Sequence, residues 1–236
     1  MITLGLQGAH TGDILMALPA IGALLARGER VGVACPEVFA KPLSYLPISW
    51  THGDQATDFA DFRKKHHAEA WLDHFGVMPV RMEFRARRVS TDPCLPVGRW
   101  CLLSPWADLP AKRWAPERWV ATGKIAARLG YKVAVVGPAK SDYLGAYITT
   151  RCEAVDLVAR CTAQTWPALL EQAAVVVTPD TGAGHMADAL GVPVIGLYGA
   201  TKLDRCAPYW DRRYCIEAAG MDAITAQDVA KKLRAI

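Results

Sequence analysis

The stretch from residue 175 to residue 198 constrains the fold of this chain more than any other. Three valines precede a Thr-Pro-Asp-Thr-Gly turn, which is typical of a buried parallel strand. Residues 183–190 are typical of a helix that ends at Gly191, and residues 192–198 form a second apolar run. This is one right-handed βαβ unit, whose turn lies where amides at a helix N-terminus can bind phosphate. An ordinary turn capped by Asp180 or Thr181 fits the same local pattern.

Strands and helices alternate along the rest of the chain as well. Before residue 93 we expect strands at 2–7, 30–34 and 46–50 and helices at 14–26, 37–45 and 58–75. After residue 98 we expect strands at 100–103, 132–136, 154–158, 175–177 and 192–198 and helices at 116–129, 141–151, 165–173, 183–190 and 225–234. Pro93, Pro96 and Gly98 punctuate the chain between the two halves.

The sequence therefore predicts an α/β protein made of two tandem Rossmann-like domains, each a parallel sheet flanked by helices. We expect a reduced N-terminal domain at 1–98 and a C-terminal domain at 99–236. In such a pair, the carboxyl ends of the strands face a cleft between the domains.

Composition limits the class of protein. Hydrophobic residues make up 52% of the 236 residues and charged residues 21%, a globular balance. The net charge of +4 fits an anionic ligand but is too small to indicate nucleic acid by itself. Seven cysteines without a Cys-x-x-Cys pair predict reduced thiols and no zinc site.

The N-terminal region gives an expectation for location. It lacks a basic signal region, and the apolar run at 14–25 is shorter than the roughly 20 residues that span a bilayer. We expect a cytoplasmic protein without a transmembrane segment, with peripheral membrane contact left open.

Four motifs occur in chain order: Gly12-Asp-Ile-Leu-x-x-Leu-Pro19, Pro110-Ala-Lys-Arg-Trp-Ala-Pro-Glu-Arg-Trp119, Asp180-Thr-Gly-x-x-His185 and Leu197-Tyr-Gly-Ala-Thr201. Together they resemble the lipopolysaccharide heptosyltransferase family, glycosyltransferase family 9, which has the two-domain GT-B fold. The resemblance covers the C-terminal domain and about the first thirty residues. It implies an enzyme that transfers a sugar from a nucleotide-diphosphate donor to an acceptor hydroxyl with inversion, and it implies neither a metal nor another cofactor.

The resemblance also implies a donor site. Negative charge develops on the departing diphosphate, so amides at the 181–182 turn and the Lys112 cation are expected to stabilise it. The residues expected to bind the donor are Lys112, Asp142, Asp180, Thr181, Gly182, His185, Gly199, Ala200, Thr201 and Lys202. Among these, Asp142 is expected to accept hydrogen bonds from the ribose. Cys161 and Thr162 are expected to edge the base pocket, although Cys161 fits core packing equally well.

Asp13 is the expected catalytic base, because a carboxylate facing the cleft can take the proton of the attacking hydroxyl. A plain helix N-cap is the alternative role of Asp13. His10 is the rival base or an acceptor contact. Lys112 completes the expected catalytic set by supplying charge to the leaving group.

The chain departs from the family pattern mainly in its short N-terminal domain, which leaves the acceptor open. Ala200 stands where proline is usual, and Trp106 where glycine is usual. A lipopolysaccharide or other glycan, lipid-linked or not, is the expected acceptor. The basic run at 81–88 suggests an alternative, a DNA glycosyltransferase acting on hydroxymethylated pyrimidines. A further alternative is a nucleotide-sugar binding module without catalysis.

Overall fold

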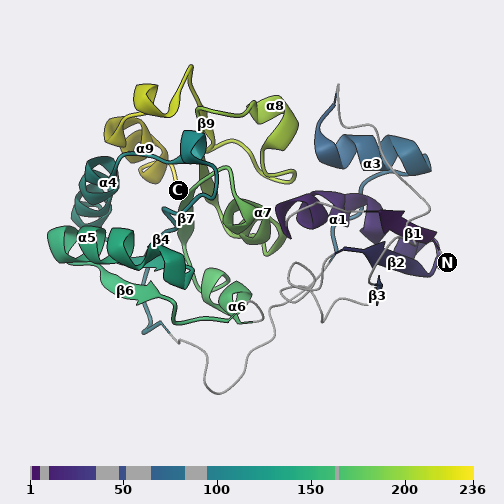
Figure 1. Cartoon of the computed structure of the whole chain (residues 1–236), viewed down its shortest axis with the longest axis horizontal. Coiled ribbons are helices and arrows are strands. Elements are labelled where there is room, and N and C mark those ends of the chain that lie inside the picture. Colours follow the sequence, from purple (N-terminus) through teal and green to yellow (C-terminus); the bar gives the residue numbers. More distant parts are fainter. Residues whose placement is uncertain (1, 6–10, 36–47, 52–64, 83–94, 163–164) are drawn as a thin grey trace.

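The computed structural model describes residues 2–5, 11–35, 48–51, 65–82, 95–162 and 165–236. These residues form two parallel β-sheets, one three-stranded and one six-stranded. Figure 1 shows the smaller sheet with α1 and α3 at one end of the long axis and the larger sheet at the other. The predicted α/β class with parallel sheets flanked by helices is thereby confirmed. The domain boundary at residue 98 stays a prediction.

The smaller sheet comes from the first half of the chain. Its strands are β1 (Ile2–Gly5), β2 (Val31–Ala34) and β3 (Ser49–Thr51), paired in that order. Helix α1 (Thr11–Ala26) follows β1, and α3 (His67–Phe75) packs against α1. The predicted helix at 37–45 and the start of the one predicted at 58–75 lie outside the described residues.

The larger sheet has the strand order of a Rossmann fold. Its strands are β4 (Trp100–Leu103), β5 (Lys132–Gly137), β6 (Val155–Val158), β7 (Val175–Pro179), β8 (Val194–Tyr198) and β9 (Ile216–Glu217). Across the sheet they run β6-β5-β4-β7-β8-β9, and all pairs are parallel. The order reverses between β4 and β7. In open α/β sheets, ligands bind beyond the carboxyl ends of the strands at this switch point.

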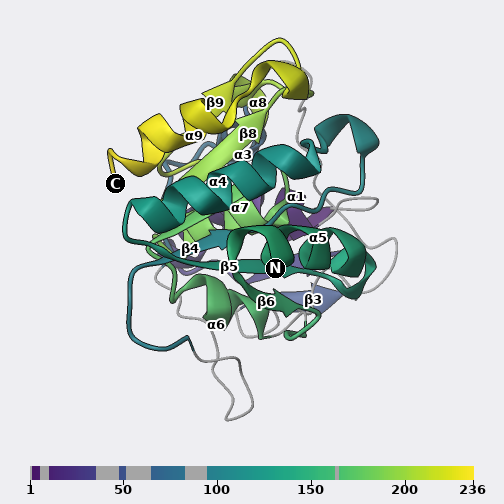
Figure 2. The same cartoon turned by 90° about the vertical axis from the view of Figure 1, so that its left-hand side faces the viewer.

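Helices cover both faces of the larger sheet. The chain forms α4 (Pro116–Arg128), α5 (Asp142–Cys152), α6 (Trp166–Leu170), α7 (Gly182–Ala189), α8 (Leu203–Cys206) and α9 (Ala226–Leu233). Helix α4 contacts α5 and α9 on one face, seen in front of the sheet in Figure 2, and α6 contacts α7 on the other. The described residues also include three short 3-10 turns, Pro110–Lys112, Ala139–Ser141 and Met221–Ala223.

Two short elements in the second half of the chain, a helix and a strand, were not expected from the sequence. Helix α8 spans four residues and β9 spans two, too few for a hydrophobic period to register. Helix α6 ends at Leu170, earlier than the predicted 173. The described cysteines are free thiols.

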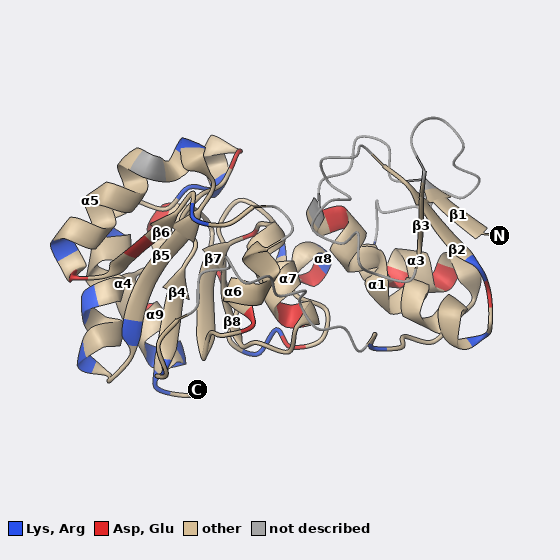
Figure 3. Ribbon diagram, turned by 90° about the horizontal axis from the view of Figure 1, so that it is seen from below, with Lys and Arg blue, Asp and Glu red and all other residues tan. Residues whose placement is uncertain are grey.

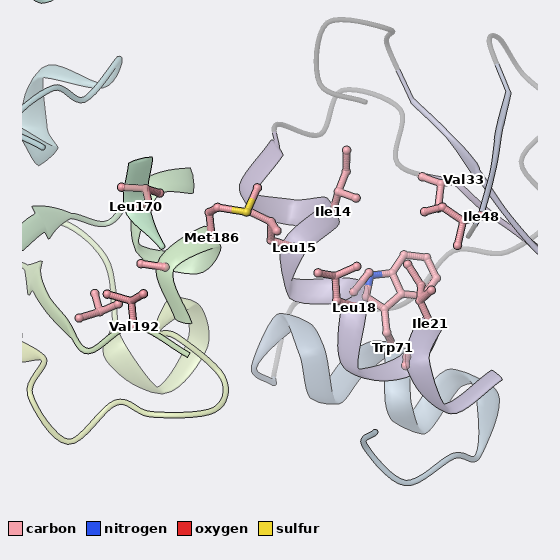
Figure 4. Packing of buried hydrophobic residues seen from close by; sticks show 14 of the residues in the cluster. Ile14, Leu15, Leu18, Ile21, Val33, Ile48, Trp71, Leu170, Met186 and Val192 are labelled. Carbon is pink, nitrogen blue, oxygen red and sulfur yellow. The ribbon is translucent and has the colours of Figure 1, made fainter. Parts of the chain in front are cut away.

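One continuous apolar core joins the two sheets. It includes Leu15 and Leu18 of α1, Trp71 of α3 and, from the other half, Leu170 and Met186. Figure 4 shows Met186 of α7 reaching toward Leu15 of α1. Helix α1 is therefore apolar on most of its circumference because it packs against the small sheet, α3 and α7 at once.

Gly22 lets another part of the chain cross α1. A Cβ atom at residue 22 would lie 2.5 Å from the carbonyl oxygen of Val80, and the Val80 amide donates to the oxygen of Pro19 at 3.2 Å. The segment after α3 thus lies directly on α1. Among the described residues, no helix combines the length and apolar character needed to cross a bilayer.

Candidate active site

A cleft of about 610 Å³ opens at the switch point of the larger sheet and is lined from both halves of the chain. The first half contributes Gly12, Asp13 and Met16 of α1 and His67 of α3. The second half contributes the segment after β4, the turn after β5, the turn between β7 and α7, and Thr201. The predicted cleft between two Rossmann-like halves is therefore present as a cavity with walls from each.

Asp180, directly after β7, organises one wall of this cleft. Its Oδ2 atom accepts from Lys112 Nζ at 2.7 Å and from Thr201 Oγ1 at 2.8 Å. Its Oδ1 atom lies 3.8 Å from Nε2 of His185. The carboxylate is 7% exposed and so ties together three segments that are distant in sequence. The sequence placed all four residues at the donor site, and the structure brings them together.

The charge of Asp180 is set by its partners. Burial alone would raise the pKa of this carboxyl, but the interaction with His185 and the positive charge of Lys112 outweigh burial and lower the pKa to about 2. Asp180 is therefore an anion throughout the neutral range. Lys112 Nζ also donates to the Asp180 carbonyl oxygen at 3.2 Å, which fixes the end of the lysine chain at the cleft wall.

The N-terminus of α7 faces the same cleft. Thr181 occupies the N-cap position in an extended conformation and makes no side-chain capping hydrogen bond. Its hydroxyl instead bonds to Thr178 Oγ1 at 2.9 Å. Thr181, Gly182 and Ala183 all line the cavity. Amides in a first helical turn carry partial positive charge and favour an anion, so this end of α7 suits a phosphate.

The opposite wall carries Asp13 in the first turn of α1, as expected. Its Oδ1 atom lies 3.8 Å from Nδ1 of His67, the first residue of α3. Helices α1 and α7 meet closely here, because a Cβ atom at Gly12 would lie 3.3 Å from Cδ2 of His185 and 3.7 Å from the Gly182 amide nitrogen. Asp13, the next residue of α1, therefore lines the same cleft as the N-terminus of α7.

An apolar pocket extends the cleft toward β6. Cys161 and Thr162 line it, as the sequence predicts. Further lining side chains are Trp106, Leu157 and Trp166, which offer flat or apolar surfaces suited to a nucleobase. Among the described residues, no group of three or more His, Cys, Asp or Glu side chains is placed to hold a metal ion.

Other predicted donor residues lie elsewhere or outside what is described. Gly199 is required by a close backbone approach, since a Cβ there would overlap the Met221 amide nitrogen. Lys202 is directed to Glu217 at 3.1 Å, and neither Lys202, Gly199 nor Ala200 is among the described residues that line the cavity. Asp142 is the first residue of α5, and its side chain lies outside the described part of the structure. His10 falls outside the described residues.

Two hydrogen bonds fasten the halves of the chain together beside the cleft. His66 accepts at Nδ1 from the Ala68 amide at 3.1 Å, so Nε2 carries the proton and donates to the Ala207 oxygen at 2.9 Å. Burial lowers the pKa of His66, which favours this neutral form. Arg81 donates to the Asp188 carbonyl oxygen at 2.7 Å. These contacts and the shared core fix the width of the cleft.

The basic run at 81–88 is thus described only at its start, and there it is structural. The Arg81 guanidinium lies 5.4 Å from the centre of the Trp210 ring as well as bonding to α7. Figure 3 shows Lys and Arg residues on α4, α5 and α9, whereas α1 and α3 contain acidic residues. The N-terminal half therefore offers, in its described part, no concentrated basic surface for a DNA acceptor.

Sequence reasoning missed His67, Met16, Trp106 and Trp166 as cleft residues. His67 lies in a polar stretch with no motif, so only its proximity to Asp13 identifies it. Trp106 could have been suspected, because it follows the predicted strand at 100–103 by three residues and the carboxyl ends of parallel strands meet at the switch point. Trp166 lies within the predicted helix at 165–173, where nothing in the local pattern indicates a cleft residue.

Comparison with known structures places the fold in the GT-B class of glycosyltransferases. A glycosyl transferase family 9 protein from Veillonella parvula superposes with a TM-score of 0.81 at 14% identity, covering 99% of this chain and 96% of that one. The E. coli ADP-heptose lps heptosyltransferase II superposes with a TM-score of 0.76 at 18% identity, covering 100% of this chain and 98% of that one. At these identities the likeness establishes the fold.

The sequence profile of glycosyltransferase family 9 (heptosyltransferase) matches residues 72–233, so the chain belongs to this family. Lipooligosaccharide heptosyltransferase 2 of Haemophilus influenzae is 33% identical over 121 residues. That match covers 44% of this chain and 32% of the relative, so the similar region is about a third of the relative's length. The family resemblance inferred from the four motifs is confirmed.

Proposed function

We propose that this protein transfers a heptose-type sugar from a nucleoside-diphosphate donor to an acceptor hydroxyl, with inversion and without a metal. The observation that carries the proposal is one cleft with a cation and a helix N-terminus on one wall and a carboxylate on the other. Lys112 and the first turn of α7 form the first wall, and Asp13 stands on the second.

The donor diphosphate is proposed to lie against Thr181, Gly182 and Lys112. Charge develops there as the bond between the anomeric carbon and phosphate oxygen breaks, and preorganised N–H groups and a cation stabilise it. Asp180 is proposed to hold Lys112 and Thr201 in place and to accept from a sugar hydroxyl. His185 is buried beside Asp180 and is proposed to complete this wall.

The rest of the donor extends toward β6. The nucleobase of the donor is proposed to lie among Cys161, Thr162 and Trp166, and its ribose near Asp142. Gly199, Ala200 and Lys202 remain candidates for the loop that closes on the phosphates when a donor is bound. Charge neutralisation by Lys112 and α7 makes a divalent cation unnecessary in this proposal.

Asp13 is proposed to be the base. The acceptor oxygen attacks the anomeric carbon from the side opposite the diphosphate, its proton passes to Asp13, and the electron pair of the breaking bond leaves with the phosphate. A base and a leaving-group site on opposite walls suit this inverting displacement. His10 remains the rival base.

A lipopolysaccharide or lipooligosaccharide is the proposed acceptor class. Support comes from the family and from the lipooligosaccharide heptosyltransferase relative. The arrangement of Arg81 and the acidic side chains of α1 and α3 gives no support to the DNA alternative. The non-catalytic alternative predicts donor binding without turnover.

The direct test is a transfer assay with ADP-heptose and a heptose-deficient lipopolysaccharide acceptor, run with and without EDTA. We expect heptosylated product and free ADP at the same rate in both samples. Binding of ADP-heptose without either product would favour the binding-module alternative. Abolition by EDTA and recovery with added metal would contradict metal independence.

A further inference from the structure

His67 stands beside the proposed base in a position that the family motifs do not include. Its Nδ1 atom lies 3.8 Å from Oδ1 of Asp13, and both side chains line the cleft. His67 is 23% exposed and Asp13 33% exposed, so neither belongs to the sealed core and both can meet a substrate.

The position of His67 is fixed by the start of α3. The preceding residue, His66, caps this helix at the Ala68 amide and bonds across to Ala207, while Trp71 anchors the same helix in the core at 1% exposure. Helix α3 also packs along α1, the helix that carries Asp13. The two side chains are therefore held opposite each other by rigid elements, which is the arrangement that preorganisation requires.

A carboxylate that acts as a base needs a defined orientation, because only one of its oxygens can face the acceptor hydroxyl. A ring nitrogen beside Oδ1 supplies that orientation when it donates to this oxygen. The separation of 3.8 Å is longer than a hydrogen bond, and such contacts commonly shorten when the substrates bind.

We propose that His67 is a positioning residue for Asp13. In its Nδ1–H form it donates to Asp13 Oδ1 and turns the carboxylate toward the acceptor hydroxyl. During transfer, the acceptor proton moves to Asp13, the new oxygen–carbon bond forms and the carbon–phosphate oxygen bond breaks with its electron pair on the diphosphate. His67 keeps its own proton throughout. This inference rests on the proposed function.

Three substitutions of His67 distinguish the loss of its hydrogen bond to Asp13 from the loss of its side-chain volume. The amide nitrogen of asparagine falls at the place of Nδ1, whereas that of glutamine falls at the place of Nε2. We expect His67→Ala and His67→Gln to lower kcat about 10- to 100-fold, part of the roughly 10²- to 10⁴-fold that general-base catalysis supplies. His67→Asn should recover to within about 3-fold of the wild type. The KM for ADP-heptose should change by less than about 2-fold in all three, because binding of the donor does not use this side chain.

His74 provides the matched control on the same helix. It lies in the last turn of α3, exposed, with its ring against Phe75, far from the cleft lining. His74→Ala should keep the wild-type kcat. A double substitution gives an independent check. In an Asp13→Asn background, His67→Ala should cause no further loss, because its effect passes through the carboxylate.

The outcomes distinguish this inference from the proposed function. If the wild type transfers no sugar from ADP-heptose, the proposed function fails and the inference fails with it. If the wild type transfers and His67→Gln or His67→Ala keeps the wild-type kcat, only the inference fails. Equal losses for the asparagine and glutamine variants, with ADP binding and thermal unfolding unchanged, also overturn it. Should His67→Ala not fold, the asparagine and glutamine pair still decides.

Discussion

At the scale of single residues, Asp180 is the centre of the proposed donor wall. Its carboxylate is almost fully buried, yet it is ionised because Lys112, Thr201 and His185 surround it. A buried charge that loses its partners is costly, and so is a buried cation that loses its carboxylate. The same contacts that shape the site therefore also contribute to stability.

Replacing Asp180 with asparagine should destabilise the protein in a pH-dependent way. The folded pKa of about 2 is below the ordinary 3.8, so the ionised carboxylate contributes stability above about pH 4 and this contribution is lost as the pH falls toward 2. From the shift we expect about 2 kcal/mol at pH 7. Urea unfolding of both proteins between pH 7 and pH 3 measures the difference. A difference in unfolding free energy that grows as the pH falls would contradict the lowered pKa of Asp180.

Replacing Lys112 with methionine should weaken ADP binding. A charge-assisted hydrogen bond contributes about 1.5–3 kcal/mol, so we expect a roughly 10- to 100-fold higher Kd by isothermal titration calorimetry. Lys124, exposed on α4 away from the cleft, is the control, and Lys124→Met should leave the Kd unchanged. An unchanged Kd in Lys112→Met would remove this lysine from the phosphate site.

At the scale of elements, the contact of α1 with α7 decides where the two walls stand. Leu15 and Met186 pack in the shared core, and the Gly12 backbone abuts His185. Asp13 and the α7 N-terminus thus sit on two helices that touch directly. A change in this packing is expected to affect both stability and the separation of base and donor.

Met186→Ala should show how much the contact between α1 and α7 contributes to the free energy of unfolding. Met186 is fully buried, and truncating a buried methionine to alanine costs about 2–5 kcal/mol of unfolding free energy. Urea denaturation followed by circular dichroism measures it. Met78, which is 79% exposed, is the matched control, and Met78→Ala should change stability by less than about 0.5 kcal/mol. Equal effects in the two variants would contradict the packing described here.

The elements also show what the sequence could and could not predict. The strand at 175–179, the turn at Asp180 and helix α7 follow from local patterns, because valine runs, a turn and a glycine cap act over a few residues. Lys112 and Thr201 were placed near Asp180 only through the family resemblance. The approach of His67 to Asp13 and the link from His66 to Ala207 depend on how α3 docks, which no local pattern encodes.

At the scale of the whole molecule, one apolar core joins the small sheet to one face of the larger sheet, and a second core lies under α4, α5 and α9 on the other face of the larger sheet. Helix α1 lies between β1 and β2 of the small sheet in the sequence, and it also packs against α7 of the other half. The cleft is consequently a groove in a joined body, with the bridges from His66 and Arg81 at its side. This continuity gives a direct expectation for unfolding.

Unfolding should be a single cooperative transition. Tryptophan fluorescence and far-ultraviolet circular dichroism should give the same midpoint in urea, because neither half can open without exposing the shared core. Two separated transitions would contradict the shared core.

ADP at 100 times its Kd should add about 2.7 kcal/mol to the free energy of unfolding, with EDTA present or absent.

The most direct test of the account compares donor binding with sugar transfer in Asp13→Asn. The variant should bind ADP-heptose with a Kd within about 2-fold of the wild type and transfer heptose at least about 100-fold more slowly, because the donor wall is intact and the base is gone. Asp73→Asn, exposed on α3, should match the wild type in both assays. Transfer by Asp13→Asn at the wild-type rate would contradict the assignment of the base and, with it, the proposed geometry of the two walls.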